Sequence, residues 1–164
     1  MINFEATLKL LAGSGITFVV VGGYAATLHG SAYLTRDLDI CYERTPENME
    51  RLVSALRPHH PRLRGAPTEL PFIFDVKTLS KGMNFTLQTD LGDIDLLGHI
   101  DGLGEFPDVA ADAASMALFG YTCRVASIDS LIRSKRAAGR AKDLNVLPEL
   151  EALKEMHAQK RSSD

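Results

Sequence analysis

Asp37 and Asp39 are the two residues whose type and spacing point most directly to chemistry. They flank the start of an apolar run, residues 38–42, that predicts a β-strand, so both carboxylates should point to one face. Two adjacent carboxylates do not both ionise readily without a cation. Hard oxygen ligands favour Mg²⁺ or Mn²⁺ over zinc. An Asp-x-Asp pattern alone is more often a solvated strand edge, so the metal site is a hypothesis that other residues must support.

A further acid lies in a later predicted strand, residues 93–97. If this strand runs beside residues 38–42, Asp95 completes a cage of three carboxylates. Such a cage holds two metal ions about 3.5–4 Å apart, the spacing for in-line phosphoryl or nucleotidyl displacement. Asp93 has the same face parity as Asp95, so the residues alone leave both choices open.

Gly22 and Gly23 separate a predicted buried strand, residues 16–21, from a predicted short helix, residues 24–29. Glycine lets the backbone come close to a phosphate, and the amide groups of such a turn favour an anion. A Gly-Gly pair by itself is more often a plain tight turn. Together with the acids it is a candidate phosphate-binding turn.

The remaining elements must form a sheet that carries these residues. Apolar runs and alternation predict strands, and apolar residues at helical spacing predict helices. Further strands are predicted at residues 84–88, 116–119 and 121–125, helical turns at 75–81 and 107–114, and a surface loop at 59–71. Helices are predicted at 3–12, 46–57 and 128–138, with a last helical region at 141–158 that is interrupted or restarted at Pro148. Thr45 and Ser127 are predicted N-caps. The order indicates an α/β (α+β) fold, with a mixed β-sheet flanked by helices rather than a regular βαβ repeat.

Size and composition narrow the class of protein. The 164 residues suit a single domain, which we assign to residues 1–159, with a frayed tail at 160–164. The formal net charge of −3 gives no global basic field for a nucleic-acid partner, although a local basic patch stays open. There is no basic segment at the start and no run of 18 apolar residues, and Cys41 and Cys123 lack the spacing of a disulfide scaffold. We therefore expect a cytoplasmic protein with no membrane partner.

Residues 22–39 resemble motif I of the DNA polymerase β-like nucleotidyltransferase superfamily. The nearest branch is that of the AbiEii-type and related minimal nucleotidyltransferases, many of which act as toxins. In that branch a double glycine is followed, at the spacing seen here, by Thr-x-Asp-hydrophobic-Asp. Asp95, followed by two leucines, matches the family's third acid better than Asp93 does. Residues 130–144 resemble the downstream motifs, a lysine on one helix and an Arg/Lys-Asp pair at the start of the next.

The resemblance implies a nucleotidyltransferase-like fold and a role for each matching acid and glycine. Gly22 and Gly23 would cradle a nucleoside triphosphate (NTP), the donor substrate. Asp37 and Asp39 would bind two Mg²⁺ (or Mn²⁺) ions. Asp95 would bind one of these ions and help to deprotonate the acceptor hydroxyl.

The resemblance also implies a cationic side to the nucleotide site. Lys135 would neutralise phosphate charge, Arg140 or Lys142 would assist, and Asp143 would orient a basic side chain or a metal-bound water. Without the resemblance, this charge run would be interpreted as a solvated helix face. Tyr24 either stacks on a base or packs in the core. The predicted nucleotide-binding set is Gly22, Gly23, Tyr24, Thr35, Lys135, Arg140, Lys142 and Asp143.

The favoured function is an enzyme that moves a nucleoside monophosphate from an NTP to a hydroxyl of RNA, protein or a small molecule. The resemblance implies that such an enzyme can be of the toxin type. The alternative is a catalytically poor nucleotide-binding or partner-binding module, such as one half of a toxin–antitoxin pair with an antitoxin partner. Tyr33, which stands where the branch often carries arginine, motivates this alternative. A third reading is an enzyme of the antibiotic-adenylating type. It predicts a pocket too narrow for RNA and a second acceptor-binding domain, or a dimer that builds one.

Overall fold

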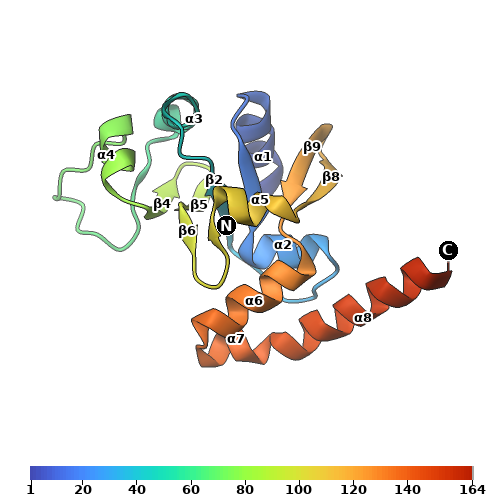
Figure 1. Cartoon of the computed structure of the whole chain (residues 1–164). Helices are drawn as coiled ribbons and strands as arrows, with labels where there is room; N and C mark the ends of the chain where they lie inside the picture. The colour runs from blue at the N-terminus through green and yellow to red at the C-terminus, as the bar shows by residue number, and fades with distance from the viewer. Residues whose placement is uncertain (164) are drawn as a thin grey trace.

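The computed structural model describes residues 1–163, in which helices and strands intermix along the chain (Figure 1). In chain order the elements are α1 Phe4–Gly13, β1 Phe18–Val21, α2 Gly22–Leu28, β2 Asp37–Tyr42, α3 Pro46–Leu56, the 3-10 helix η1 Arg57–His59, β3 Arg62–Leu63, α4 Val76–Lys81, β4 Asn84–Thr89, β5 Gly92–Leu97, β6 His99–Ile100, β7 Gly104–Glu105, α5 Phe106–Ala111, β8 Ala114–Leu118, β9 Tyr121–Val125, α6 Ile128–Ala138, α7 Ala141–Asn145 and α8 Leu147–Ser163. No helix among the described residues is both long and apolar enough to cross a membrane.

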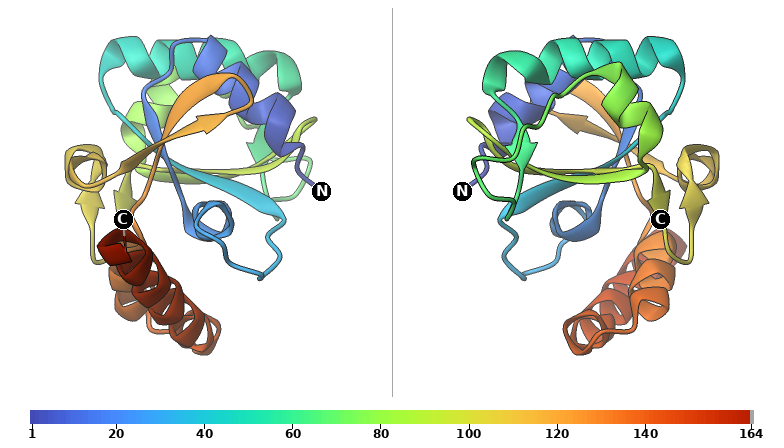
Figure 2. Two further views of the ribbon diagram at one scale, coloured as in Figure 1. Left: turned by 90° about the vertical axis from the view of Figure 1, so that its right-hand side faces the viewer. Right: turned by 90° about the vertical axis from the view of Figure 1, so that its left-hand side faces the viewer.

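One mixed sheet forms the centre of the molecule. Its seven strands have the order β3-β4-β5-β2-β1-β9-β8, and β6 and β7 pair separately. β1 and β2 are antiparallel, whereas β2 with β5 and β1 with β9 are parallel. Helices α1 and α3 lie on one face of the sheet, and α2 with α6–α8 lies on the other (Figure 2). This is the α/β architecture, a mixed sheet flanked by helices, that was predicted from the sequence.

Apolar side chains fix the register of the two strands that carry the acids. Leu38 and Ile40 of β2 are fully buried, and so are Ile94 and Leu96 of β5. Because side chains alternate along a strand, the aspartates between them face the other side of the sheet. A slip of one residue would bury the acids and expose the leucines and isoleucines, so the apolar pattern holds the acids in place.

Local signals set the bounds of the C-terminal helices. Ser127 caps α6 by accepting a hydrogen bond from the backbone N–H of Ser130, as predicted. Gly139, with a φ of 66°, ends α6 in the left-handed conformation that glycine adopts without strain. The chain then restarts as α7 with Arg140 as its N-cap residue. This break turns the cationic segment back toward α6.

Several segments differ from the sequence expectations, among them the β6–β7 pair, which was not predicted. The chain passes directly from β1 into α2, which therefore begins at Gly22 rather than at Tyr24. Residues 62–63 of the predicted loop pair with β4 as β3, because the prolines of the segment flank this stretch and do not interrupt it. Helix α8 continues through Ser163, beyond the predicted helix end at residue 158, and residue 164 lies outside the described residues. The division into one domain and a frayed tail stays a prediction.

Candidate metal and nucleotide site

Three aspartates converge on the face of the sheet beneath α2 and α6. Parallel pairing of β2 with β5 places Asp39 directly opposite Asp95, with Asp37 one step away on the same face. One carboxylate oxygen from each of the three lies within 4.8 Å of the others. Asp93, the competing choice, pairs with Asp37 in the register but is not part of this group. The structure thus brings together the three acids that were expected to act together.

The environment of Asp39 suits a carboxylate that binds a cation. Its Oδ1 is buried and has no hydrogen-bond partner among the described residues. Burial raises the pKa of Asp39 to about 8, and the charges of Asp95 and then Asp37 add to the effect. Burial also raises the pKa of Asp95. Because a divalent cation would satisfy the orphaned oxygen and offset the repulsion, these residues fit Mg²⁺ or Mn²⁺.

The pH dependence of stability should reveal the raised pKa values. A carboxyl group whose pKa is higher in the folded than in the unfolded state binds more protons when folded, so stability is greatest at low pH and falls as pH rises. For Asp39 the window runs from its ordinary value of 3.8 to about 8. In EDTA, the free energy of unfolding should fall across this window by up to ~1.4 kcal/mol per pH unit.

Urea unfolding in EDTA at several pH values between 5 and 8 measures this slope. An Asp39→Asn protein is the matched control, because it keeps the shape of the side chain and loses its titration. It should show a clearly flatter profile. Parallel profiles for the two proteins would mean that Asp39 titrates normally.

Gly22 and Gly23 are required because side chains at and just before β2 approach their backbone closely. Gly22 has a φ of 66°, and a Cβ atom added to it would lie 2.1 Å from Asp39 Oδ2. A Cβ atom on Gly23 would lie 2.8 Å from the Thr35 hydroxyl oxygen. That hydroxyl donates a hydrogen bond of 3.2 Å to the carbonyl of Asp37. The turn is therefore more than a plain tight turn, because the absence of side chains lets the acids stand against the start of α2.

A buried aspartate organises the cations on the helical side. Asp143 is 1% exposed and accepts hydrogen bonds from Lys135 Nζ at 3.3 Å and Arg140 Nε at 2.6 Å. The hydrogen bond from Arg140 is the main cause that lowers the pKa of Asp143, which therefore stays ionised. The turn at Gly139 makes this possible by bringing α7 back against α6. Asp143 thus orients two basic side chains.

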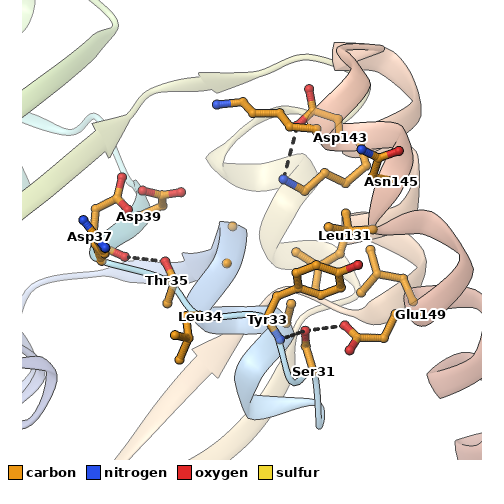
Figure 3. A pocket seen from close by; sticks show the side chains of 18 of the residues that line it. Ser31, Tyr33, Leu34, Thr35, Asp37, Asp39, Leu131, Asp143, Asn145 and Glu149 are labelled. Carbon is orange, nitrogen blue, oxygen red and sulfur yellow. Dashed lines mark hydrogen bonds and ion pairs between the residues drawn. The ribbon is translucent and has the colours of Figure 1, made fainter.

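These two halves enclose a pocket of about 710 Å³. The acids lie on one side of it and the C-terminal helices on the other (Figure 3). Its walls include every predicted site residue except Tyr24, namely Gly22, Gly23, Thr35, Asp37, Asp39, Asp95, Lys135, Arg140, Lys142 and Asp143.

Tyr24 packs in the core and not in the pocket. Its ring stacks on Phe4 with 4.0 Å between the ring centroids, and the residue is 9% exposed. Since α2 begins at Gly22, Tyr24 falls on the side of the helix that faces α1. Of the two readings that the sequence left open for Tyr24, the structure favours core packing over base stacking.

Arg64 is a residue of the site that sequence reasoning missed. Its Nη2 donates a hydrogen bond of 2.7 Å to Asp95 Oδ1, and its Nη1 lies 3.8 Å from Asp37 Oδ2. Its Nε lies 3.3 Å from Asp93 Oδ2, without making a hydrogen bond. Only the pairing of β3 with β4 brings this residue to the acids. No local pattern around Arg64 signals that pairing.

We expect an Arg64→Met protein to be less stable by about 1.5–3 kcal/mol in EDTA, the range for hydrogen bonds made to charged groups. Without the guanidinium, the carboxylates would repel one another, and added Mg²⁺ should therefore raise the melting temperature more than it does in the wild type. The matched control is Arg62→Met, since Arg62 is an exposed arginine on β3, two residues before Arg64. Equal melting curves for the two variants, with and without Mg²⁺, would show that Arg64 carries no such charge balance.

Comparisons with known proteins identify the fold. No protein-family model and no curated protein matches the sequence. Among solved structures, the lincosamide antibiotic adenylyltransferase LnuA, bound to lincomycin, is similar with a TM-score of 0.59 and 14% identity over 92% of this chain and 97% of its own. TM1012 from Thermotoga maritima, described as a nucleotidyltransferase, has a TM-score of 0.52 and 17% identity over 97% of this chain and 96% of its own. The antibiotic-resistance factor ANT(2'')-Ia has a TM-score of 0.52 and 13% identity over 98% of this chain and 91% of its own.

At these identities the likeness shows the fold. The chain has the nucleotidyltransferase fold, and the carboxylate cluster, the glycine turn and the Asp143 cation cluster lie around one pocket of it.

Proposed function

We propose that the protein is a metal-dependent nucleotidyltransferase that moves a nucleoside monophosphate from an NTP to a hydroxyl group. The observation that carries this proposal is the convergence of Asp37, Asp39 and Asp95, with carboxylate oxygens within 4.8 Å of one another. They converge in a pocket that also holds a glycine turn and a buried Asp143 with two cations. Carboxylates, phosphate-sized space and positive charge are the three things that phosphoryl chemistry needs in one place.

The three acids would hold Mg²⁺ or Mn²⁺, which supplies charge stabilisation to the attacking and leaving oxygens. Gly22 and Gly23 leave room for the triphosphate beside the acids, and Lys135 neutralises part of its charge. The acceptor oxygen bonds to the α-phosphorus as the bond from that phosphorus to the pyrophosphate oxygen breaks. Asp95 takes the proton of the acceptor hydroxyl, and pyrophosphate leaves with the released electron pair.

A small molecule is the acceptor that the observations favour. A second pocket, of about 410 Å³, shares Gly22, Lys135, Arg140 and Asp143 with the first, so a compact acceptor could reach the same centre. The formal net charge of −3 does not favour RNA. Two of the similar structures are named for antibiotics. The similarity to LnuA extends over 97% of the LnuA chain.

The AbiEii-type branch, a toxin role and an antitoxin partner stay predictions that rest on motif spacing alone. A cytoplasmic location is likewise a prediction from composition. The alternative of a catalytically poor binding module gains no support from the site, because all three acids and both glycines are in place.

Incubation with NTPs labelled in the α-phosphate tests the proposal. The protein, Mg²⁺ and panels of aminoglycosides, lincosamides, tRNA and protein acceptors would be combined, and both pyrophosphate and labelled acceptor would be measured. We expect pyrophosphate and labelled product in equal amounts with a small-molecule acceptor. Label on tRNA or protein alone would mean that the acceptor is a macromolecule and not a small molecule. NTP binding without pyrophosphate release from any acceptor would favour the binding module.

A further inference from the structure

The segment between α2 and β2 is held at both ends by hydrogen bonds. At one end, the Glu149 carboxylate on α8 accepts hydrogen bonds from the Ser31 hydroxyl and, at 3.0 Å, from the Ala32 backbone N–H. The Ser31 hydroxyl oxygen in turn accepts from the backbone N–H of Tyr33 at 3.2 Å. At the other end, Thr35 is bonded to β2. The backbone of this segment is therefore fixed, although it has no regular secondary structure.

This fixed segment presents two large apolar side chains to solvent. Tyr33 is 53% exposed and Leu34 is 97% exposed. Both line the pocket that contains the acids, and Tyr33 extends toward Leu131 and Glu149 (Figure 3). Both oxygens of Glu149 are used by the loop, so this carboxylate positions Tyr33 and is not free to bind a ligand. An aromatic ring held open at a pocket wall suits a flat ligand group that can stack on it.

The layout of the pocket indicates what that group is. In the proposed function, the metal ions held by Asp37, Asp39 and Asp95 place the phosphates at one side of the pocket. The pocket is also lined by apolar side chains, among them Leu131 and Leu150. Nucleobases bind to proteins by stacking on aromatic rings, whatever their sequence or identity. A nucleotide with its phosphates at the acids has only its base and ribose left to fill the rest of the pocket.

We propose that Tyr33 is the stacking platform for the nucleobase of the donor NTP, and that Glu149 is the positioning residue that holds the platform in place. This inference rests on the proposed function and adds to it a specificity-determining residue. It also gives a role to the tyrosine that stands in place of the arginine common in the AbiEii-type branch. The purine bases, which offer the larger stacking surface, should bind more tightly than the pyrimidines.

The chain contains no tryptophan, so a Tyr33→Trp protein carries a single reporter at the proposed platform. Its fluorescence should be quenched by Mg-ATP and unchanged by Mg-tripolyphosphate, which has no base. A Tyr121→Trp protein is the matched control. Tyr121 is 40% exposed on β9, lies against Gly13 and does not line the pocket. Its fluorescence should respond to neither ligand.

Calorimetry with the unlabelled variants measures the size of the effect. Tyr33→Ala should weaken Mg-ATP binding by about 5- to 150-fold, the range expected for loss of one base–aromatic stack, and leave tripolyphosphate binding unchanged. Tyr33→Phe should bind as the wild type, because only the ring is required. Glu149→Gln should weaken Mg-ATP binding in the same direction, by less.

The possible failures are distinguishable. If the wild type binds Mg-ATP and Tyr33→Ala binds it equally well, the platform is overturned and the proposed function stands. Equal weakening of ATP and tripolyphosphate in Tyr33→Ala would also overturn it, since the variant would then have damaged the phosphate site. If the wild type binds no nucleotide, both the platform and the proposed function are wrong.

Discussion

An Asp39→Asn protein should lose nucleotide transfer by about a thousandfold or more and still fold, with higher stability than the wild type near pH 8. Asp39 is buried, its Oδ1 has no partner, and its neighbours Asp95 and Asp37 raise its pKa to about 8. The amide has almost the same shape but never carries a charge. It therefore relieves the repulsion in the metal-free protein. It also removes a metal ligand and several kcal/mol of the charge stabilisation that the reaction requires.

Two measurements together test this expectation: the rate of pyrophosphate release and the free energy of unfolding in EDTA. Asp93→Asn is the matched control, because Asp93 has the same face parity and belongs to the same sheet but lies outside the carboxylate group. It should keep the rate within about tenfold of the wild type, the smaller end of what a change beside the ligands costs. If Asp93→Asn is as inactive as Asp39→Asn, the metal group has been assigned to the wrong acids.

Gly22→Ala should reduce both activity and stability. The loss of stability should exceed that of a glycine-to-alanine change at a left-handed position that has open space around it. The φ of 66° makes alanine strained, by about 1–2 kcal/mol. The added Cβ would in addition lie 2.1 Å from Asp39 Oδ2, so either α2 or the carboxylate must move. Overpacking of this kind costs a further ~1–3 kcal/mol. The displaced carboxylate is one of the three proposed metal ligands, so transfer should be lost as well.

Gly15→Ala separates the two causes. Gly15 has a φ of 73°, close to that of Gly22, and a Cβ atom added there would meet nothing within 4 Å. It should therefore show the backbone strain alone, with transfer unchanged. Denaturant unfolding and the transfer rate of the two variants give the comparison. Similar losses in both variants would mean that the contact with Asp39 is unimportant and that Gly22 serves only the turn.

The residues predicted correctly from the sequence are those whose signal is local. The apolar residues Leu38 and Ile40 alternate with Asp37 and Asp39, which predicts both the strand and the face of the acids. The expectation that β5 lies beside β2 was conditional, because nothing local specifies a parallel pairing. The structure confirms that pairing and with it the meeting of Asp39 and Asp95.

The residues that were missed reach the site through long-range contacts. Arg64 comes from a stretch that contains prolines on both sides and pairs only as a two-residue strand. Glu149 contacts Ser31 across 118 positions of sequence. For Tyr24, the sequence did not determine which side of the short helix carries the ring. The start of α2 at Gly22 decides it, by turning Tyr24 onto Phe4. Registers and helix phases of this kind follow from tertiary packing and not from local propensity.

The most direct test of the site is calorimetric titration of ATP, GTP, CTP and UTP, with and without Mg²⁺, into the wild type and the Asp37→Ala/Asp39→Ala double variant. We expect at least one nucleotide to bind to the wild type only when Mg²⁺ is present, and that binding to be lost in the double variant, whose fold is checked by its melting curve. Binding that is equal in the two proteins, or that does not depend on Mg²⁺, would contradict the assignment of Asp37 and Asp39 as the metal ligands of a nucleotide site.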